Sequence, residues 1–206
     1  MKKLFLASFV AYSIDKLIAA FKLVPQNLTV AFVPTAGGTY PEEKRGFVAE
    51  DRGKLVEKGF KVKDVDLKGK TKDELMEESK GVDIIFVAGG NTFYLLEKAK
   101  ESGFDELAKC LVGKGVIYVG SSAGAALAGP DIEPVGPLDD PSKAPNLKST
   151  KGLGLVNFVI LPHWGKEKFK ERYEKVMKRY GKSGYKLIKI TDEQAVVVEG
   201  NKYNIV

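Results

Sequence analysis

Cysteine and histidine are scarce in this chain, and each shortage excludes a class of site. The 206 residues include one cysteine, Cys110, and one histidine, His163. A single cysteine forms no intrachain disulfide and excludes a zinc site built from several cysteines. Cys110 lies in the amphipathic stretch FDELAKCLVGKG, so we predict that it is a small core residue rather than a reactive thiol. A serine mechanism that needs a histidine base can use only His163.

The sequence also lacks an apolar run long enough to cross a bilayer and a basic run interleaved with aromatic residues. The net charge is +6, but the lysines are mixed with Glu and Asp in stretches such as KEKFKERYEKVMKRYGKSG. This mixture is typical of a solvated surface, so we expect neither nucleic-acid nor membrane binding. The start, MKKLFLASFVAYS, has no clear cleavage site, and we interpret it as a buried first strand of a cytoplasmic protein.

Phosphate-binding motifs are missing as well. GKT at 69–71 and GKS at 181–183 lack the upstream glycine that a Walker A loop requires. No GxGxxG follows any strand-like run. We therefore expect a protein that works without a nucleotide, another cofactor or a metal.

Apolar runs of strand length alternate with amphipathic stretches along most of the chain. Several of these runs are continuously apolar, which is typical of strands covered on both faces. The alternation predicts βαβ units, and hence a mainly parallel sheet with helices on both faces in a single domain, 1–206. The predicted strands are 4–9, 28–36, 60–67, 83–90, 115–121, 158–163, 185–190, 194–200 and 202–206, and the predicted helices are 14–21, 47–56, 71–81, 93–99, 104–115 and 169–180.

Two local signals refine this outline. Thr71 and Glu74 have the spacing of a capping box, which predicts a helix start. Gly200 and Asn201 separate the last two strand-like runs, which predicts an antiparallel C-terminal hairpin.

Three predicted strands end in residues that could do chemistry: FVAGGNT, YVGSSAGA and ILPHWG. Ligands bind at the carboxyl ends of the strands in an open α/β sheet, so we expect these three ends to meet at one edge. Residues 120–124, GSSAG, fit the G-x-S-x-G turn that presents a nucleophilic serine, and this frame selects Ser122 over Ser121. The alternative is a helix start with a serine cap and small packing residues.

Partners for such a serine can be proposed from the other two strand ends. His163 follows an apolar strand and would be the base. The backbone N–H groups around Gly90 could form an oxyanion hole with the N–H of Ala123, although a phosphate-binding loop fits the GGNT turn too. A third residue would be an acid that orients the histidine, and spacing alone leaves five candidates: Asp192, Glu193, Asp131, Asp139 and Asp140.

Taken together, VAGGNTFYLL, VGSSAGAALAGP and LPHW resemble peptidase family S51, which includes dipeptidase E (aspartyl dipeptidase) and its relative cyanophycinase. The resemblance covers nearly the whole chain, including PTA at 34–36 and TDEQAVVVEG near the end. It implies a flavodoxin-like, three-layer α/β sandwich related to the class I glutamine amidotransferases. It also implies the site residues: Ser122 as nucleophile, His163 as general base, Gly90 and Ala123 as oxyanion hole, and Asp192 as the third member, with Glu193 as the alternative.

The resemblance implies a serine peptidase that acts on small peptides through an acyl-enzyme, as a monomer or homodimer, with a possible preference for N-terminal Asp. The predicted substrate-binding residues are Asn91, Lys166, Lys168 and Arg172. Two other functions stay open. One is a non-catalytic ligand-binding or interaction protein on the same fold, and the other is a serine esterase that takes its acid from residues 131–140.

Overall fold

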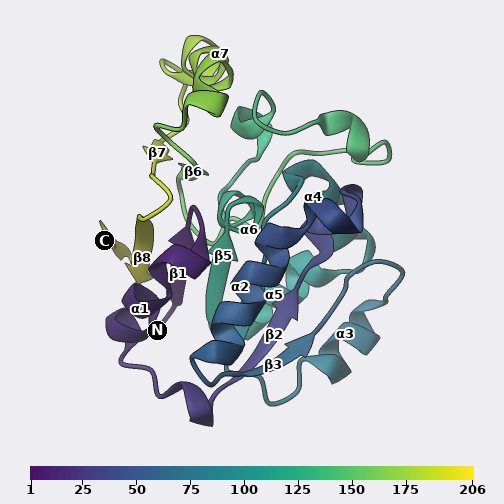
Figure 1. Ribbon diagram of the computed structural model, residues 1–206. Helices are drawn as coiled ribbons and strands as arrows, with labels where there is room; N and C mark the ends of the chain where they lie inside the picture. The colour runs from purple at the N-terminus through teal and green to yellow at the C-terminus, as the bar shows by residue number, and fades with distance from the viewer.

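The computed structural model describes residues 1–206 and contains a seven-stranded sheet in the order β3-β2-β4-β5-β1-β8-β9 (Figure 1). The first five strands of the chain pair in parallel, whereas β8 pairs antiparallel with β1 and with β9. The predicted α/β class and antiparallel C-terminal hairpin are therefore confirmed. The strands are β1 Lys3–Ala7, β2 Thr29–Val33, β3 Lys61–Asp64, β4 Ile84–Val87, β5 Ile117–Ser121, β8 Ala195–Glu199 and β9 Lys202–Ile205.

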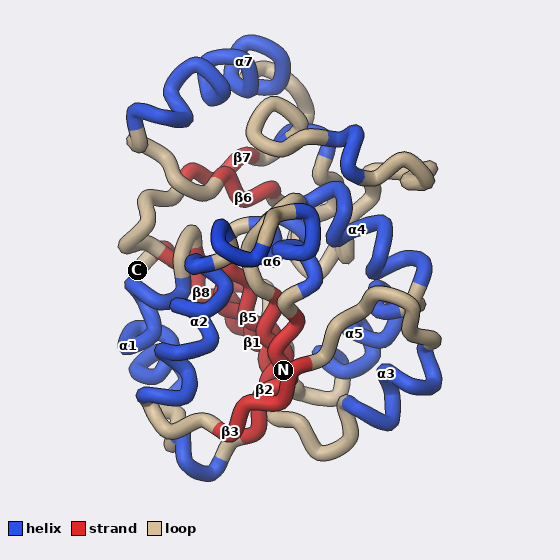
Figure 2. The backbone as a smooth tube through the Cα atoms, turned by 45° about the vertical axis from the view of Figure 1, so that its right-hand side comes forward, coloured by secondary structure: helices blue, strands red, loops and turns tan.

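Helices cover both faces of the sheet, which gives three layers (Figures 1 and 2). Alternation along β1 separates the two cores: Leu4 and Leu6 pack on the α4 side, and Phe5 and Ala7 pack on the α1 side. None of the helices has the length and apolarity needed to cross a membrane. The helices are α1 Val10–Phe21, α2 Gly46–Glu57, α3 Lys72–Glu78, α4 Thr92–Glu101, α5 Phe104–Gly113, α6 Ala123–Leu127 and α7 Lys170–Tyr180.

Helix starts are stabilised in two different ways. The predicted capping box begins α3, because the side chain of Thr71 accepts from the N–H of Glu74 and the Glu74 carboxylate accepts from the N–H of Thr71. Helix α1 has no local cap. Its first amides instead donate to side chains from other elements, Val10 to the Oγ of Ser121 and Ala11 to the Oδ1 of Asp51.

Cys110 is exposed on α5, so its prediction as a core residue was wrong. The buried face of this helix consists of Phe104, Leu107, Ala108 and Val112. Position 110 lies on the other side of the helix, where a thiol meets solvent.

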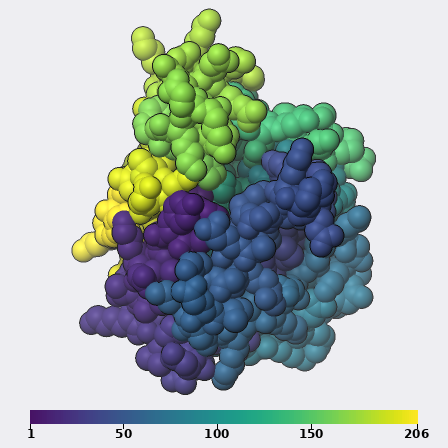
Figure 3. All heavy atoms as spheres, viewed as in Figure 1, coloured from purple at the N-terminus to yellow at the C-terminus, as the bar shows by residue number.

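The strand predicted at 158–163 does not join the main sheet. It forms β6 (Val159–Leu161), which pairs in parallel with β7 (Leu187–Lys189) in a separate two-stranded sheet. The physical reason is that β8 occupies the edge beside β1 over residues 3–7. Strand β6 instead lies near α6, and Figure 3 shows the segment that contains α7 standing above the rest of the molecule.

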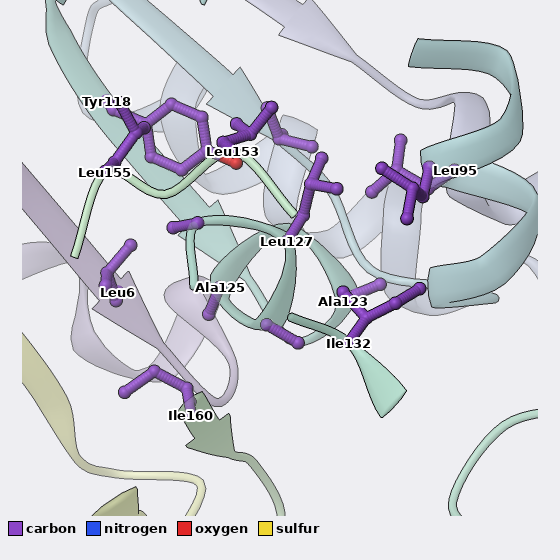
Figure 4. Close-up of a cluster of buried hydrophobic side chains, with 14 of the residues drawn as sticks. Leu6, Leu95, Tyr118, Ala123, Ala125, Leu127, Ile132, Leu153, Leu155 and Ile160 are labelled. Atoms are coloured by element: carbon purple, nitrogen blue, oxygen red, sulfur yellow. The ribbon is translucent and has the colours of Figure 1, made fainter. Parts of the chain in front are cut away.

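Small side chains let α6 approach the strands beneath it. Ala123, Ala125 and Leu127 are buried, and Figure 4 shows Ala125 on the side of Leu6 and Ile160, and Ala123 beside Ile132. The run of alanine and glycine after Ser122 therefore packs the helix that follows the serine, and it also brings β6 close to the end of β5.

Candidate active site

Ser122 directly follows β5 in a strained turn. Its φ of 49° and ψ of −103° lie in a region that side-chain-bearing residues rarely adopt. The turn needs both flanking glycines: a Cβ at Gly124 would lie 2.1 Å from the carbonyl oxygen of Val87, and one at Gly120 would lie 2.5 Å from the Gly124 carbonyl. The N–H of Ser122 donates to the carbonyl of Ala7 at 3.0 Å, which ties the turn to the neighbouring strand. The result is a serine side chain held at the carboxyl end of the sheet.

The serine meets the only histidine of the chain. Ser122 Oγ lies 2.9 Å from Nε2 of His163, and Nδ1 of that ring lies 2.6 Å from Oδ1 of Asp192. Phe169 stacks on the imidazole with the ring centroids 5.3 Å apart. The three side chains therefore form a continuous hydrogen-bonded series, with the geometry that lets an imidazole remove a proton from a hydroxyl.

The structure brings one of the five candidate acids to the histidine. Asp192 lies between β7 and β8 and is buried, with 5% of its surface exposed. Glu193, the next residue, is exposed and accepts a hydrogen bond from Thr191. The loop acids hydrogen-bond elsewhere and not to His163: Asp131, Asp139 and Asp140.

Sequence reasoning missed Ser8, which contacts two members of this series. Its Oγ donates to Oδ1 of Asp192 at 2.8 Å and accepts from the backbone N–H of His163 at 2.7 Å. Ser8 is fully buried and directly follows β1, the neighbour of β5. The available signal was the first polar side chain after the apolar run Leu4–Ala7, at the carboxyl end of a strand.

Lys166, predicted to contact substrate, lines the pocket and also contacts the acid. Its ammonium forms an ion pair with Oδ2 of Asp192, and no other group contacts that oxygen. Burial alone would raise the pKa of Asp192, but hydrogen bonds from His163, Lys166 and Ser8 outweigh burial and hold its pKa well below the ordinary value. Asp192 is therefore an anion throughout the neutral range.

Two backbone amides beside the serine are unpaired. The N–H groups of Gly90 and Ala123 donate no hydrogen bond within the chain. Gly90 has a φ of 144°, and a Cβ there would lie 2.1 Å from the carbonyl oxygen of Ala36. Only glycine fits at position 90. The turn lies next to the turn that holds Ser122, because a Cβ on Gly89 would be 3.3 Å from the Cβ of Ser122. Free amides in this position suit an oxyanion.

A pocket of about 540 Å³ opens over these groups. One side of the pocket is cationic, with Lys168 and Arg172, and the Nη1 of Arg172 donates to the carbonyl of Leu138 at 2.8 Å, which joins two walls. Asp139 also lines the pocket, with Oδ2 accepting from the N–H and the hydroxyl of Thr92. Six aromatic residues line the pocket as well: Phe9, Tyr12, Tyr40, Phe47, Phe169 and Tyr173.

The prediction that Asn91 binds substrate needs correction. Its Oδ1 accepts from the N–H of Tyr94 as the cap of α4, and its Nδ2 donates to the carbonyl of Asp140 at 2.9 Å. The residue is 3% exposed and does not line the pocket. Both polar ends of the side chain hold the α4 start and the 129–149 stretch together.

Two buried titratable groups also border the pocket. The hydroxyl of Tyr173 has no partner, and burial, together with the carboxylates of Asp192 and Asp139, raises its pKa, so it stays protonated. Asp51 is 1% exposed, and burial raises its pKa to about 7 against the opposing hydrogen bonds from Ser121 and Ala11. No group of three or more His, Cys, Asp or Glu side chains is placed to hold a metal ion.

Several known proteins are similar to this chain in sequence and in fold. The model of peptidase family S51 matches residues 5–206. An uncharacterized peptidase of Listeria monocytogenes is 34% identical over 203 residues, which is 98% of this chain and 97% of the relative. A Drosophila melanogaster protein described as a probable alpha-aspartyl dipeptidase is 31% identical over 84% of this chain and 70% of its own length. A crystal structure of a candidate peptidase E from Listeria monocytogenes aligns with a TM-score of 0.91 and 30% identity, and covers 100% of this chain and 98% of that one.

Proposed function

The chain belongs to peptidase family S51, and on that premise we propose that it is a serine-type peptidase that cleaves short peptides through an acyl-enzyme on Ser122. The observation that carries the proposal is the hydrogen-bonded series from Ser122 through His163 to Asp192, at 2.9 Å and 2.6 Å. Each role in it has a physical basis. The serine is held in a strained turn, the histidine is the only one in the chain, and the acid is a buried anion.

In this mechanism Nε2 of His163 takes the proton of Ser122 as Oγ forms a bond to the peptide carbonyl carbon. The carbonyl oxygen becomes an oxyanion and accepts from the N–H groups of Gly90 and Ala123. The imidazolium, paired with Asp192, then protonates the departing amine as the C–N bond breaks. Water repeats the sequence: it gives a proton to His163, attacks the ester carbon and releases the acid, and Ser122 regains its proton.

The pocket supports a short substrate with charged ends. A volume of about 540 Å³ is within the range of small-ligand sites. Lys168 and Arg172 offer positive charge for a carboxylate, and the second oxygen of Asp139 offers an acceptor for a free α-ammonium group. We infer a dipeptidase, with a preference for an acidic N-terminal residue as the finer expectation.

The two alternatives receive less support. An esterase with an acid from residues 131–140 requires one of those carboxylates on His163, whereas its Nδ1 lies beside Asp192. Ligand binding alone does not require a serine in a strained turn, a histidine Nε2 2.9 Å from its Oγ and two free amides in one pocket.

The test is hydrolysis of dipeptides by the wild type and the Ser122→Ala variant. The panel pairs N-terminal Asp with Ala and Lys, and each peptide with its N-acetylated form. We expect cleavage of free dipeptides and a loss of at least about 10³-fold in kcat for Ser122→Ala. Ser121→Ala is the matched control, because its Oγ faces the start of α1 rather than His163. Activity that survives Ser122→Ala would remove the serine mechanism.

A further inference from the structure

Lys166 lines the pocket, but its ammonium group contacts Asp192, the carboxylate that hydrogen-bonds to His163. Asp192 receives three groups: His163 and Ser8 on Oδ1, and Lys166 on Oδ2. The ion pair with Lys166 is the only polar contact of Oδ2. Asp192 is 5% exposed, whereas the lysine side chain is 45% exposed and approaches from the pocket.

We propose that Lys166 is a positioning residue of the catalytic series: it shares the negative charge of Asp192 with His163 and so keeps the imidazole in its neutral, proton-accepting form down to lower pH. The proposal rests on the proposed serine mechanism. A lone carboxylate beside a histidine favours the imidazolium, which cannot accept the proton of Ser122. A second cation on the same carboxylate offsets that preference.

The other charges around His163 and Asp192 leave this role to Lys166. From the 129–149 stretch, the carboxyl group of Asp139 lines the same pocket and acts on His163 electrostatically. From α7, the uncharged hydroxyl of Tyr173 lies near Asp192. From the end of β1, Ser8 contributes a neutral hydroxyl.

The other two pocket cations do not contact Asp192. Lys168 lies over the ring of Phe169, with Nζ 5.0 Å from its centroid, and Arg172 donates to the carbonyl of Leu138. Arg172 acts on Asp139 and neither cation forms an ion pair with Asp192, so Lys166 is the cation paired with the acid beside the imidazole.

The test replaces Lys166 with Met and follows His163 directly. Because the chain has one histidine, an NMR titration of the imidazole needs no assignment and no substrate. We expect the protonation midpoint of the Lys166→Met imidazole to lie about one pH unit above that of the wild type, a tenfold change for one nearby charge at intermediate dielectric. In the pH profile of kcat/KM, the midpoint on the acidic side (the acid limb) should rise by the same amount. Lys166→Arg should restore the wild-type midpoint.

Lys170→Met is the matched control, since Lys170 is exposed and pairs only with Glu167 at 3.6 Å. An unmoved imidazole midpoint in Lys166→Met would overturn the proposal. So would a raised KM with an unmoved acid limb, which would make Lys166 a substrate-binding residue. The NMR titration also separates the two proposals: a shifted midpoint in a protein that cleaves no peptide supports the role of Lys166 and counts against the peptidase function.

Discussion

At the scale of single residues, the site depends on two residues whose backbone conformations are unfavourable for any residue with a side chain. Ser122 has a φ of 49° and His163 a φ of 62°. A left-handed conformation costs a non-glycine residue about 1–3 kcal/mol, so the surroundings must hold each in place. Ser122 is held by the carbonyl of Ala7, and His163 by the hydroxyl of Ser8. The end of β1 therefore fixes the backbone of both Ser122 and His163.

Replacing Asp192 with Asn should separate its role from that of Glu193. The amide cannot balance an imidazolium and favours the wrong histidine tautomer, so we expect kcat of Asp192→Asn to fall by about 10³–10⁴ at neutral pH. Glu193→Gln, the adjacent exposed control, should keep kcat within about twofold of the wild type. Steady-state dipeptide hydrolysis measures both. Equal losses in the two variants would contradict the assignment of Asp192.

Residue-scale prediction from the sequence was specific where composition left little choice, and it stayed open where it needed strand order. The GSSAG frame and the lone histidine single out Ser122 and His163, and the structure places these two side chains together. Asp192 and Glu193 are adjacent, and only the conformation of their turn decides which one faces inward. The position of Ser8 at a strand end was visible in the sequence, but nothing in the sequence says that β1 lies beside β5, so its contacts with His163 and Asp192 could not be predicted.

At the scale of elements, the serine depends on how closely α6 approaches β4 and β5. Gly120 and Gly124 allow this approach, since a Cβ on either would overlap backbone atoms. The approximate positions of these strands and their mainly parallel pairing follow from the apolar runs between amphipathic helices. The second sheet does not, because competition between β6 and β8 for the edge beside β1 is decided by tertiary packing.

Adding one methyl group at Gly124 should destabilise the fold, whereas adding one at Gly113 should not. A Cβ at Gly124 would lie 2.1 Å from the Val87 carbonyl oxygen, and one at Gly113 meets nothing within 4 Å. We expect Gly124→Ala to lower the free energy of unfolding by about 3 kcal/mol. We expect Gly113→Ala, in α5, to raise it by about 0.5–1 kcal/mol. Denaturant unfolding of the two variants checks this, and similar stabilities would contradict the close approach of α6.

At the scale of the whole molecule, a buried carboxyl couples folding to pH. Asp51 on α2 accepts from the N–H of Ala11 on α1 at 2.8 Å, and its Oδ2 has no partner. Burial raises its pKa to about 7. Because the folded-state pKa is above the unfolded value, the stability that this group contributes is complete below about pH 4 and is lost as the pH rises through 7.

The Asp51→Asn variant should therefore have a flatter stability profile than the wild type. A difference of about three pKa units corresponds to roughly 4 kcal/mol, so the wild type should lose up to that much relative to the variant between about pH 4 and pH 8. Denaturant unfolding across this range measures the difference. Glu43→Gln, which removes an exposed carboxylate that does not act on Asp51, should follow the wild-type profile. Parallel profiles for Asp51→Asn and the wild type would show that Asp51 does not titrate in this range.

The reactivity of Ser122 can be measured most directly by covalent labelling. The protein is treated with a fluorophosphonate, its intact mass is recorded, and the adduct is mapped by peptide sequencing. We expect one adduct per chain, on Ser122, and none in the Ser122→Ala or His163→Ala variants, because the hydroxyl is nucleophilic only with its base in place. An unlabelled wild-type protein, or an adduct on Ser121 or Ser8, would contradict the assignment of Ser122 as the nucleophile.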